Sequence, residues 1–261
     1  MKITGSETYV LRVPLKQRTI TDSQTSLDAV EFVAIRLDTD DGLQGWGFNW
    51  NYTQGTRAVK TLIDDAYAPY LIGRDPLRHK EVCRDLFYKP HFIGRVGIAQ
   101  VGLCAIEMAM WDIRCQVAGM PLWRYLGPCK DRVKAYNTDG GWLSWTTEEL
   151  IRDMSAIVER GFDAVKMKIG RPDPREDYER VKAVRKALGD RVQLMVDVNT
   201  VWDLKTAMVW GRRLEEFDIG WLEEPLHPFD RRAHAELAKA LDVPIAVGET
   251  IYTKWDFRDY I

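Results

Sequence analysis

The sequence has few of the residues that build zinc sites and disulfide frameworks. Among its 261 residues are four cysteines and four histidines, and no two cysteines have Cys-x-x-Cys spacing. These features argue against a zinc site and a disulfide framework. We expect reduced thiols in a cytoplasmic protein.

Long apolar runs and an excess of one charge are missing as well. The most apolar stretch, residues 96–111, is interrupted by Gln100 and Glu107, and a membrane span needs about 18 uninterrupted apolar residues. The N-terminus lacks the apolar core of a signal peptide. A net charge of −2 provides no basic field for nucleic acid or anionic lipid. We therefore expect neither a membrane nor a nucleic-acid partner.

The first part of the chain has the pattern of an α+β domain. Three segments alternate apolar and polar residues as strands do: residues 3–13, 30–37 and 43–48. Three later segments have helical periodicity: residues 56–71, 76–88 and 97–118. The polar segment 16–28 is expected to be a mobile loop. Gly127-Pro128 is predicted to end this domain, which therefore covers residues 1–128.

From residue 133 onward the pattern becomes a strict alternation of strand and helix. Five apolar runs are predicted strands: residues 133–138, 164–169, 192–198, 220–223 and 244–248. Four helical patterns separate them: residues 147–160, 175–188, 203–217 and 230–241. Parallel strands with helical crossovers form a barrel or a doubly wound sheet. Charged residues at successive strand ends favour an α/β barrel over residues 129–261, because a wound sheet gathers its ligands at one switch point.

Three acidic residues end successive predicted strands. They are Asp197, Glu223 and Glu249, which follow one another at intervals of 26 residues. The C-terminal ends of barrel strands point into one site, and Mg²⁺ prefers oxygen ligands while keeping positions for water or substrate. Each motif alone is commonplace, since Glu-Glu-Pro or Gly-Glu-Thr after a strand usually starts a loop. Their order and equal spacing predict a Mg²⁺ site.

Two lysines on the upstream strand provide a candidate base. Alternation places Lys166 and Lys168 on the same face. A Lys-x-Lys pair in isolation is more often a solvated face, but barrel strands are normally covered on both sides. A neighbouring ammonium and a nearby cation both lower the pKa of a lysine. We therefore predict that Lys168 is the base that removes a proton from the substrate and that Lys166 lowers the pKa of this base. A lysine base beside Mg²⁺ suits removal of the proton alpha to a carboxylate, which predicts an enzyme acting on a small carboxylate.

Together these motifs resemble the enolase superfamily of the mandelate racemase/muconate lactonizing enzyme type. The resemblance rests on four motifs: Lys166-Met167-Lys168, Asp197-Val198-Asn199, Leu222-Glu223-Glu224-Pro225 and Gly248-Glu249. The segment from Cys104 to Gly127 also resembles the capping-domain signature of that family. The resemblance covers the whole chain and implies an N-terminal α+β capping domain followed by a modified (β/α)7β barrel.

The resemblance also implies a reaction class. Glu249 stands where muconate lactonizing relatives usually have Asp, and it is similar to the mandelate racemase-like branch, which contains acid-sugar dehydratases and racemases. We expect Mg²⁺-dependent dehydration of a sugar-derived acid to a 2-keto-3-deoxy acid, with a racemase or epimerase of an α-hydroxy acid as the alternative. Residues 14–28 and 48–55 correspond to the specificity loops of the family. Asn49, Tyr52 and Asn199 are expected to bind the substrate, and family members are often homo-oligomers.

The predicted barrel has five of the strands that a complete barrel needs. A full barrel takes roughly 250 residues, so we interpret the chain as C-terminally truncated by about 90 residues. In the family, a His supported by an Asp on later strands supplies the second acid/base group. A rival of another class is a non-catalytic half-barrel with an open sheet edge, and we expect the isolated 261-residue chain to be poorly soluble or inactive.

Overall fold

The computed structural model describes residues 1–15, 19–52 and 54–261. Residues 16–18 of the predicted loop and residue 53 of the predicted second loop lie outside the described residues. The chain forms two compact units, which we describe separately. The first contains the N-terminal strand and Leu27–Arg132, and the second contains Thr19–Ser26 and Val133–Ile261.

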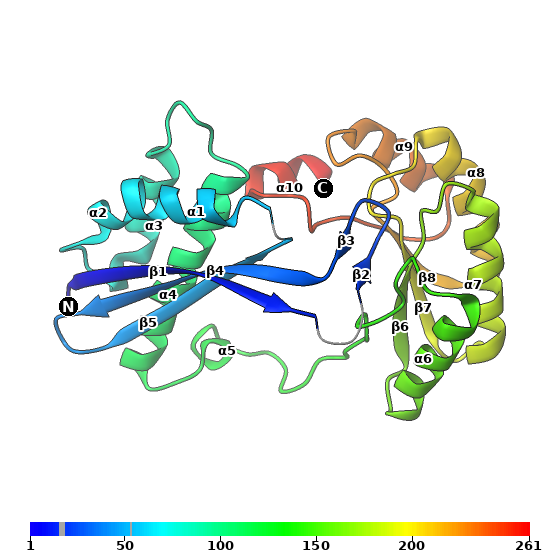
Figure 1. Ribbon diagram of the computed structural model, residues 1–261, viewed down its shortest axis with the longest axis horizontal. Helices are drawn as coiled ribbons and strands as arrows, with labels where there is room; N and C mark the ends of the chain where they lie inside the picture. The colour runs from blue at the N-terminus through cyan, green and yellow to red at the C-terminus, as the bar shows by residue number, and fades with distance from the viewer. Residues whose placement is uncertain (16–18, 53) are drawn as a thin grey trace. The chain divides into compact units, whose positions relative to one another are not determined.

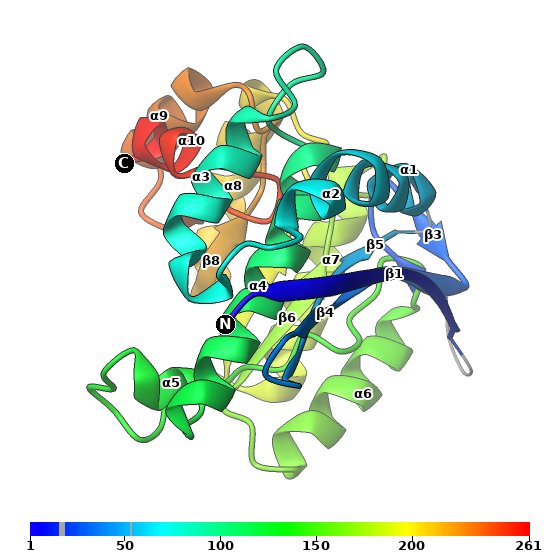
Figure 2. The same ribbon diagram turned by 90° about the vertical axis from the view of Figure 1, so that its left-hand side faces the viewer.

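The first unit is an antiparallel sheet covered by helices on one face (Figure 2). Its strands, in the order β1-β4-β5, are β1 (Ile3–Pro14), β4 (Ala29–Thr39) and β5 (Gln44–Asn51). The helices are α1 (Thr56–Leu62), η1 (Ile63–Tyr67), α2 (Ala68–Leu71), η2 (Pro76–Arg78), α3 (His79–Tyr88), α4 (Ile98–Ala118) and α5 (Leu122–Tyr125). The core forms where apolar side chains of the sheet meet α1, η1, α3 and α4, so the predicted α+β domain is confirmed.

Two glycines on β5 allow α4 to lie directly against the strand. A Cβ atom on Gly47 would come within 1.9 Å of the Ala105 carbonyl oxygen, and one on Gly45 within 2.2 Å of the Ala109 carbonyl oxygen. Any side chain at these positions would force the helix away from the sheet. The glycines at positions 42, 45 and 47 do not have the spacing of a dinucleotide-binding fingerprint, and packing against α4 explains two of them.

The second unit is a parallel sheet in the order β6-β7-β8-β9, with helices on one face (Figure 1). Its strands are β6 (Ala164–Lys168), β7 (Gln193–Asp197), β8 (Ile219–Glu223) and β9 (Ile245–Ala246). Its helices are α6 (Thr147–Glu159), α7 (Pro174–Leu188), α8 (Leu204–Leu214), η3 (Glu215–Phe217), α9 (Arg231–Ala240) and α10 (Lys254–Tyr260). Apolar side chains from the sheet and from helices α6–α9 form one core. The fold is consistent with part of a (β/α) barrel.

The predicted strand at 133–138 is wrong. This segment contains only an isolated bridge, in which Asn137 pairs with Val165 alongside β6. The pairing does not extend toward the C-terminus because Gly140 and Gly141 follow with φ of 127° and 65°, which turn the backbone away from an extended path. The segment still reaches the sheet, since the amide of Lys168 donates to the Gly141 carbonyl oxygen at 2.8 Å.

The polar segment predicted as a loop contains short strands. These are β2 (Ile20–Thr21) and β3 (Ser26–Leu27), which pair with each other. Within the second unit, Thr21 is anchored at Ser144: its hydroxyl donates to Ser144 Oγ at 2.8 Å and accepts from the Ser144 amide at 3.0 Å. Residues 19–26 are therefore fixed to the second unit.

The described residues include no helix with both the length and the apolar character required to cross a bilayer.

Candidate metal centre

Strand register places the predicted site residues beside one another. Lys168 pairs with Asp197, and Asp197 pairs with Glu223 on the next strand. Glu249 follows β9, three residues after the pairing of Glu223 with Ala246. One carboxylate oxygen from each of Asp197, Glu223 and Glu249 lies within 4.8 Å of the other two. The structure therefore brings together the three residues that the sequence predicts as metal ligands.

The three carboxylates differ in their environment. Asp197 is fully buried, the Glu223 side chain is 14% exposed, and Glu249 is exposed as a whole residue. Burial acts to raise the pKa of Asp197, but the ammonium groups of Lys168 and Lys166 outweigh it and lower this pKa. Shielding of the Glu249 carboxyl group from water, together with repulsion from Asp197, raises the pKa of Glu249. Repulsion between close carboxylates is the electrostatic condition that a bound cation relieves.

Both lysines reach into this group of carboxylates from β6. Lys166 Nζ lies 3.1 Å from Asp197 Oδ2 and 2.6 Å from Glu223 Oε1. Lys168 Nζ lies 2.6 Å from the same Asp197 oxygen. Burial acts to lower the pKa of Lys166, but the Asp197 and Glu223 carboxylates outweigh it and raise this pKa. At Lys166, the like-charge effect predicted from the Lys-x-Lys spacing is therefore overcome by the facing acids.

The donor set fits a hard divalent cation. All three groups are carboxylates on the ends of adjacent parallel strands, and no soft sulfur ligand stands beside them among the described residues. Oxygen-only sites suit Mg²⁺, Ca²⁺ and Mn²⁺. Asp197, Glu223 and Glu249 would hold the ion.

Asn199 links two of the acids. Its amide donates to Asp197 Oδ1 at 3.0 Å, and its side-chain Nδ2 donates to Glu249 Oε1 at 3.1 Å. The residue is buried, and no partner for its Oδ1 atom lies among the described residues. Asn199 therefore orients carboxylates directly, whereas its predicted contact with substrate stays a prediction.

Glu224 lies next to a predicted ligand but faces elsewhere. It has a left-handed φ of 40° and is 2% exposed. Thr250 Oγ1 donates to its Oε1 atom at 2.8 Å. Burial raises the pKa of Glu224 to about 7. This contact joins the residue after one predicted ligand, Glu223, to the residue after another, Glu249.

A buried ion pair that the sequence pattern does not reveal fixes the end of β6. Asp177 Oδ2 accepts from the amides of Gly170 and Arg171 at 2.7 and 2.8 Å. Arg180 Nη1 donates to Asp177 Oδ1 at 2.9 Å and to the Lys168 carbonyl oxygen at 3.2 Å. Asp177 and Arg180 are 1% and 3% exposed. In the sequence, the feature that could have indicated this pair is the position of both residues on the apolar face of α7, in line with Val181 and Val184.

Asn49 and Tyr52, predicted to bind substrate, belong to the first unit. Asn49 lies on β5 opposite Val33, and Tyr52 follows the strand with its ring 4.9 Å from that of Trp50. Their roles stay predictions.

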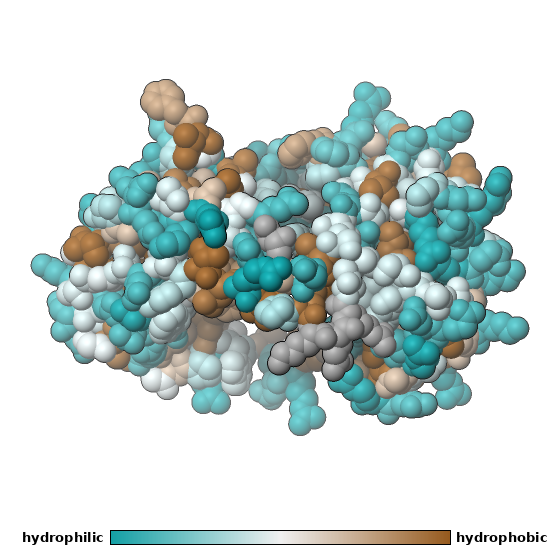
Figure 3. All heavy atoms as spheres, viewed as in Figure 1, coloured by the Kyte–Doolittle hydropathy of each residue, from teal (hydrophilic) through white to brown (hydrophobic). Residues whose placement is uncertain are grey.

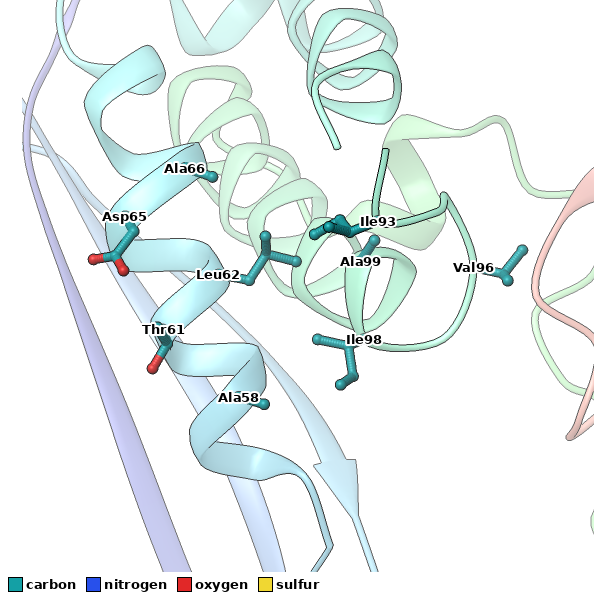
Figure 4. Close-up of a pocket in the computed structure, with 9 residues that line it drawn as sticks. All are labelled: Ala58, Thr61, Leu62, Asp65, Ala66, Ile93, Val96, Ile98 and Ala99. Atoms are coloured by element: carbon teal, nitrogen blue, oxygen red, sulfur yellow. The ribbon is translucent and has the colours of Figure 1, made fainter. Parts of the chain in front are cut away.

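A cavity of about 690 Å³ opens in the first unit between α1 and the start of α4. Figure 4 shows Ala58, Leu62 and Ala66 on the side of α1–η1 that faces Ile93 and Ala99. The loop before α4 adds apolar surface, and hydrophobic side chains protrude there in Figure 3. The lining of the cavity is apolar except for Thr61 and Asp65, and it does not include the acids or lysines of the candidate metal centre.

The profile of the mandelate racemase/muconate lactonizing enzyme N-terminal domain matches residues 5–127. The profile described as enolase C-terminal domain-like matches residues 149–261. These two matches cover the capping-type unit and the strands that carry the site.

Two curated relatives are acid-sugar dehydratases. The chain is 36% identical to L-talarate/galactarate dehydratase of Salmonella typhimurium LT2, over 93% of this chain and 60% of the relative. It is 38% identical to arabinonate dehydratase of Saccharolobus solfataricus, over 88% of this chain and 62% of the relative. The chain thus spans about three fifths of the length of these relatives.

A similar solved structure is that of a racemase from Streptomyces coelicolor A3(2) with bound magnesium. It has a TM-score of 0.95 and 33% identity, and the match covers 99% of this chain and 72% of that one. The prediction of Mg²⁺ as the cofactor is confirmed by this similar structure, which contains bound magnesium.

Proposed function

Because the chain belongs to the mandelate racemase/muconate lactonizing enzyme family of the enolase superfamily, we propose that it takes part in Mg²⁺-dependent removal of the proton alpha to a carboxylate. One observation carries the proposal. Three carboxylates lie within 4.8 Å of one another beside two buried lysines, all on neighbouring strand ends.

Asp197, Glu223 and Glu249 would hold the ion. When bound, Mg²⁺ would act as a Lewis acid on the substrate carboxylate and stabilise the negative charge that develops as the α-proton leaves. Lys168 Nζ would accept that proton. Lys166, held by Asp197 and Glu223, would keep positive charge beside the reacting centre. Both ammonium groups contact carboxylate oxygens of the predicted ligands. The proposed base and the proposed metal ligands therefore occupy one compact site.

The finer proposal is dehydration of a sugar-derived acid. In this reaction the α-proton passes to Lys168, and the electron pair of that C–H bond forms a carbon–carbon double bond. The β-hydroxyl departs as water after gaining a proton from a general acid, and the resulting enol becomes the 2-keto-3-deoxy acid. Support comes from the two dehydratases among the relatives. Asn49, Tyr52 and Asn199 stay the predicted residues for binding substrate hydroxyls.

A racemase or epimerase of an α-hydroxy acid is a second candidate, favoured by the similar structure described as a racemase. It would begin with the same proton transfer, but the carbon would regain a proton on the opposite face and no water would be lost. A non-catalytic protein that retains only the metal site is the rival of another class.

The test uses protein expressed from the complete gene and a panel of acid sugars with Mg²⁺ in D₂O. A dehydratase releases a 2-keto-3-deoxy acid, detected as its semicarbazone, and loses this activity in Lys168→Ala. Deuterium incorporation at the α-carbon without dehydration would identify the racemase or epimerase. Metal binding without exchange for any acid in the panel would favour the non-catalytic rival.

A further inference from the structure

The segment Thr19–Ser26 is hydrogen-bonded to the turn that follows β7. Ser23 Oγ donates to the carbonyl oxygens of Val198 at 2.7 Å and of Asn199 at 3.3 Å. Gln24 Nε2 donates to the Asn199 carbonyl oxygen at 2.6 Å and to Thr200 Oγ1. Two neighbouring side chains therefore hold three successive residues directly beyond Asp197.

The donors of this clamp, Ser23 and Gln24, are themselves held in place. Asp22 Oδ1 accepts from the amides of Gln24 and Thr25 at 2.7 and 2.8 Å. Ser23 also lies close to Gly170, where an added Cβ atom would stand 3.0 Å from Ser23 Cβ. The hydrogen bonds to Asp22 form an Asx turn, which fixes the backbone that carries Ser23 and Gln24.

The clamped backbone has an unfavourable conformation. Asn199 and Thr200 have φ of 50° and 67°, and for a β-branched residue such as Thr200 a positive φ is an outlier. Strained residues persist only where the surrounding structure holds them. The Thr200 amide adds one restraint by donating to the Glu224 carbonyl oxygen at 2.7 Å, and the clamp provides the others.

Strain at this turn bears directly on the metal centre. The backbone amide of Asn199 donates to Asp197 and its side chain donates to Glu249. If the turn relaxed, these two hydrogen bonds would no longer hold the carboxylates in position. Groups that hydrogen-bond to metal ligands set the orientation of those ligands. We propose that Ser23 and Gln24 are positioning residues for the metal centre, which they act on through Asn199. This inference rests on the proposed function, because it takes Asp197 and Glu249 as the ligands.

The proposal is tested by Mn²⁺ affinity, measured by electron paramagnetic resonance on protein expressed from the complete gene. We expect Gln24→Leu and the double variant Ser23→Ala/Gln24→Leu to bind Mn²⁺ about tenfold more weakly than the wild type. Thr21→Val is the matched control, because it cuts the contact of the same segment with Ser144 and leaves the clamp intact. Its Mn²⁺ affinity should stay within twofold of the wild type.

A double-mutant cycle separates positioning from general destabilisation. In an Asn199→Ala background the effect of Gln24→Leu on Mn²⁺ affinity should shrink, because the side-chain link from residue 199 to Glu249 is already cut and only the link from its amide to Asp197 remains. Unchanged affinity in the clamp variants, or an equal loss in Thr21→Val, would overturn the inference. Asp197→Asn distinguishes the two proposals: if it binds Mn²⁺ normally, the metal centre itself is wrongly assigned.

Discussion

The ammonium group of Lys168 lies 2.6 Å from Oδ2 of Asp197, which joins the proposed base to a proposed metal ligand. A cation bound by Asp197 would therefore compete with Lys168 for the same oxygen. Metal binding would weaken this ion pair and release Lys168 Nζ from the Asp197 oxygen. The ion pair thus gives a physical reason why metal binding at Asp197 should change the contacts of the Lys168 ammonium group.

Removing a proposed ligand should weaken metal binding strongly. We expect Asp197→Asn and Glu223→Gln each to weaken Mn²⁺ binding by more than about 100-fold, since loss of a ligand should exceed the effect of an outer partner. Isothermal titration calorimetry measures this. Asp190→Asn, an exposed acid in the same unit, is the control and should bind normally. Retained binding in both ligand variants would refute the site.

Removing the proposed base should stop proton transfer but leave the ion bound. We expect Lys168→Ala to reduce the rate of α-proton exchange with D₂O by about 10³-fold, within the range for a general base. Mn²⁺ affinity should not fall, because an ammonium competitor has been removed from Asp197. Lys182→Ala, on the exposed side of α7, serves as the control. Exchange at the wild-type rate in Lys168→Ala would assign the base elsewhere.

Glu224 should make the stability of the metal-free protein depend on pH. Its pKa is raised from an ordinary 4.5 to about 7, so the folded state binds this proton more tightly than the unfolded state. The resulting stabilisation is complete below pH 4.5 and is lost as the pH rises through 7. Between pH 5 and 8 in EDTA, the melting temperature of the wild type should fall more than that of Glu224→Gln. Glu179→Gln, at an exposed position, should follow the wild type, and parallel curves for wild type and Glu224→Gln would contradict the assignment.

The buried pair on α7 should be needed for both stability and catalysis. Breaking it in Asp177→Asn or Arg180→Met should cost about 3 kcal/mol of unfolding free energy in urea titrations, because a buried charge loses its partner. The activity of folded protein should also fall, since Arg180 holds the carbonyl of Lys168. Exposed Glu176→Gln should change neither. Full stability in the single variants would show that the pair is dispensable.

The sequence predicted the metal centre because its residues stand at strand ends. A carboxylate that ends an apolar run has a fixed direction in a parallel sheet, and equal spacing places three of them side by side. The site could therefore be assembled without knowing any long-range contact. The strand predicted at 133–138 is reduced to one bridge at Asn137, and two glycines with positive φ end the extended path after it. Local alternation of polar and apolar residues does not show where pairing between strands stops.

Other parts of the centre depend on contacts that local patterns do not contain. Ser23 bonds to a carbonyl 175 residues away in the chain, so its polar surroundings indicated only a loop. Asp177 and Arg180 interrupt the apolar face of α7, and no local pattern distinguishes such a buried pair from solvated charges on a helix. Gly45 and Gly47 had no interpretable spacing, since their role is set by a helix that begins about fifty residues later.

Arg185 closes the opposite end of the same sheet. Its guanidinium makes four hydrogen bonds, to the carbonyl oxygens of Phe217, Gly189, Val192 and Asp218, just before β7 and β8 begin. Arg185 thus ties together the entrances of β7 and β8, while the candidate metal centre lies at the exits of the same strands. For directed evolution, this separation means that residues beyond the strand exits that do not hold the metal ligands can be varied for new substrates while Arg185 keeps the sheet in register. A library that varied Arg185 would lose folded members before it gained any new activity.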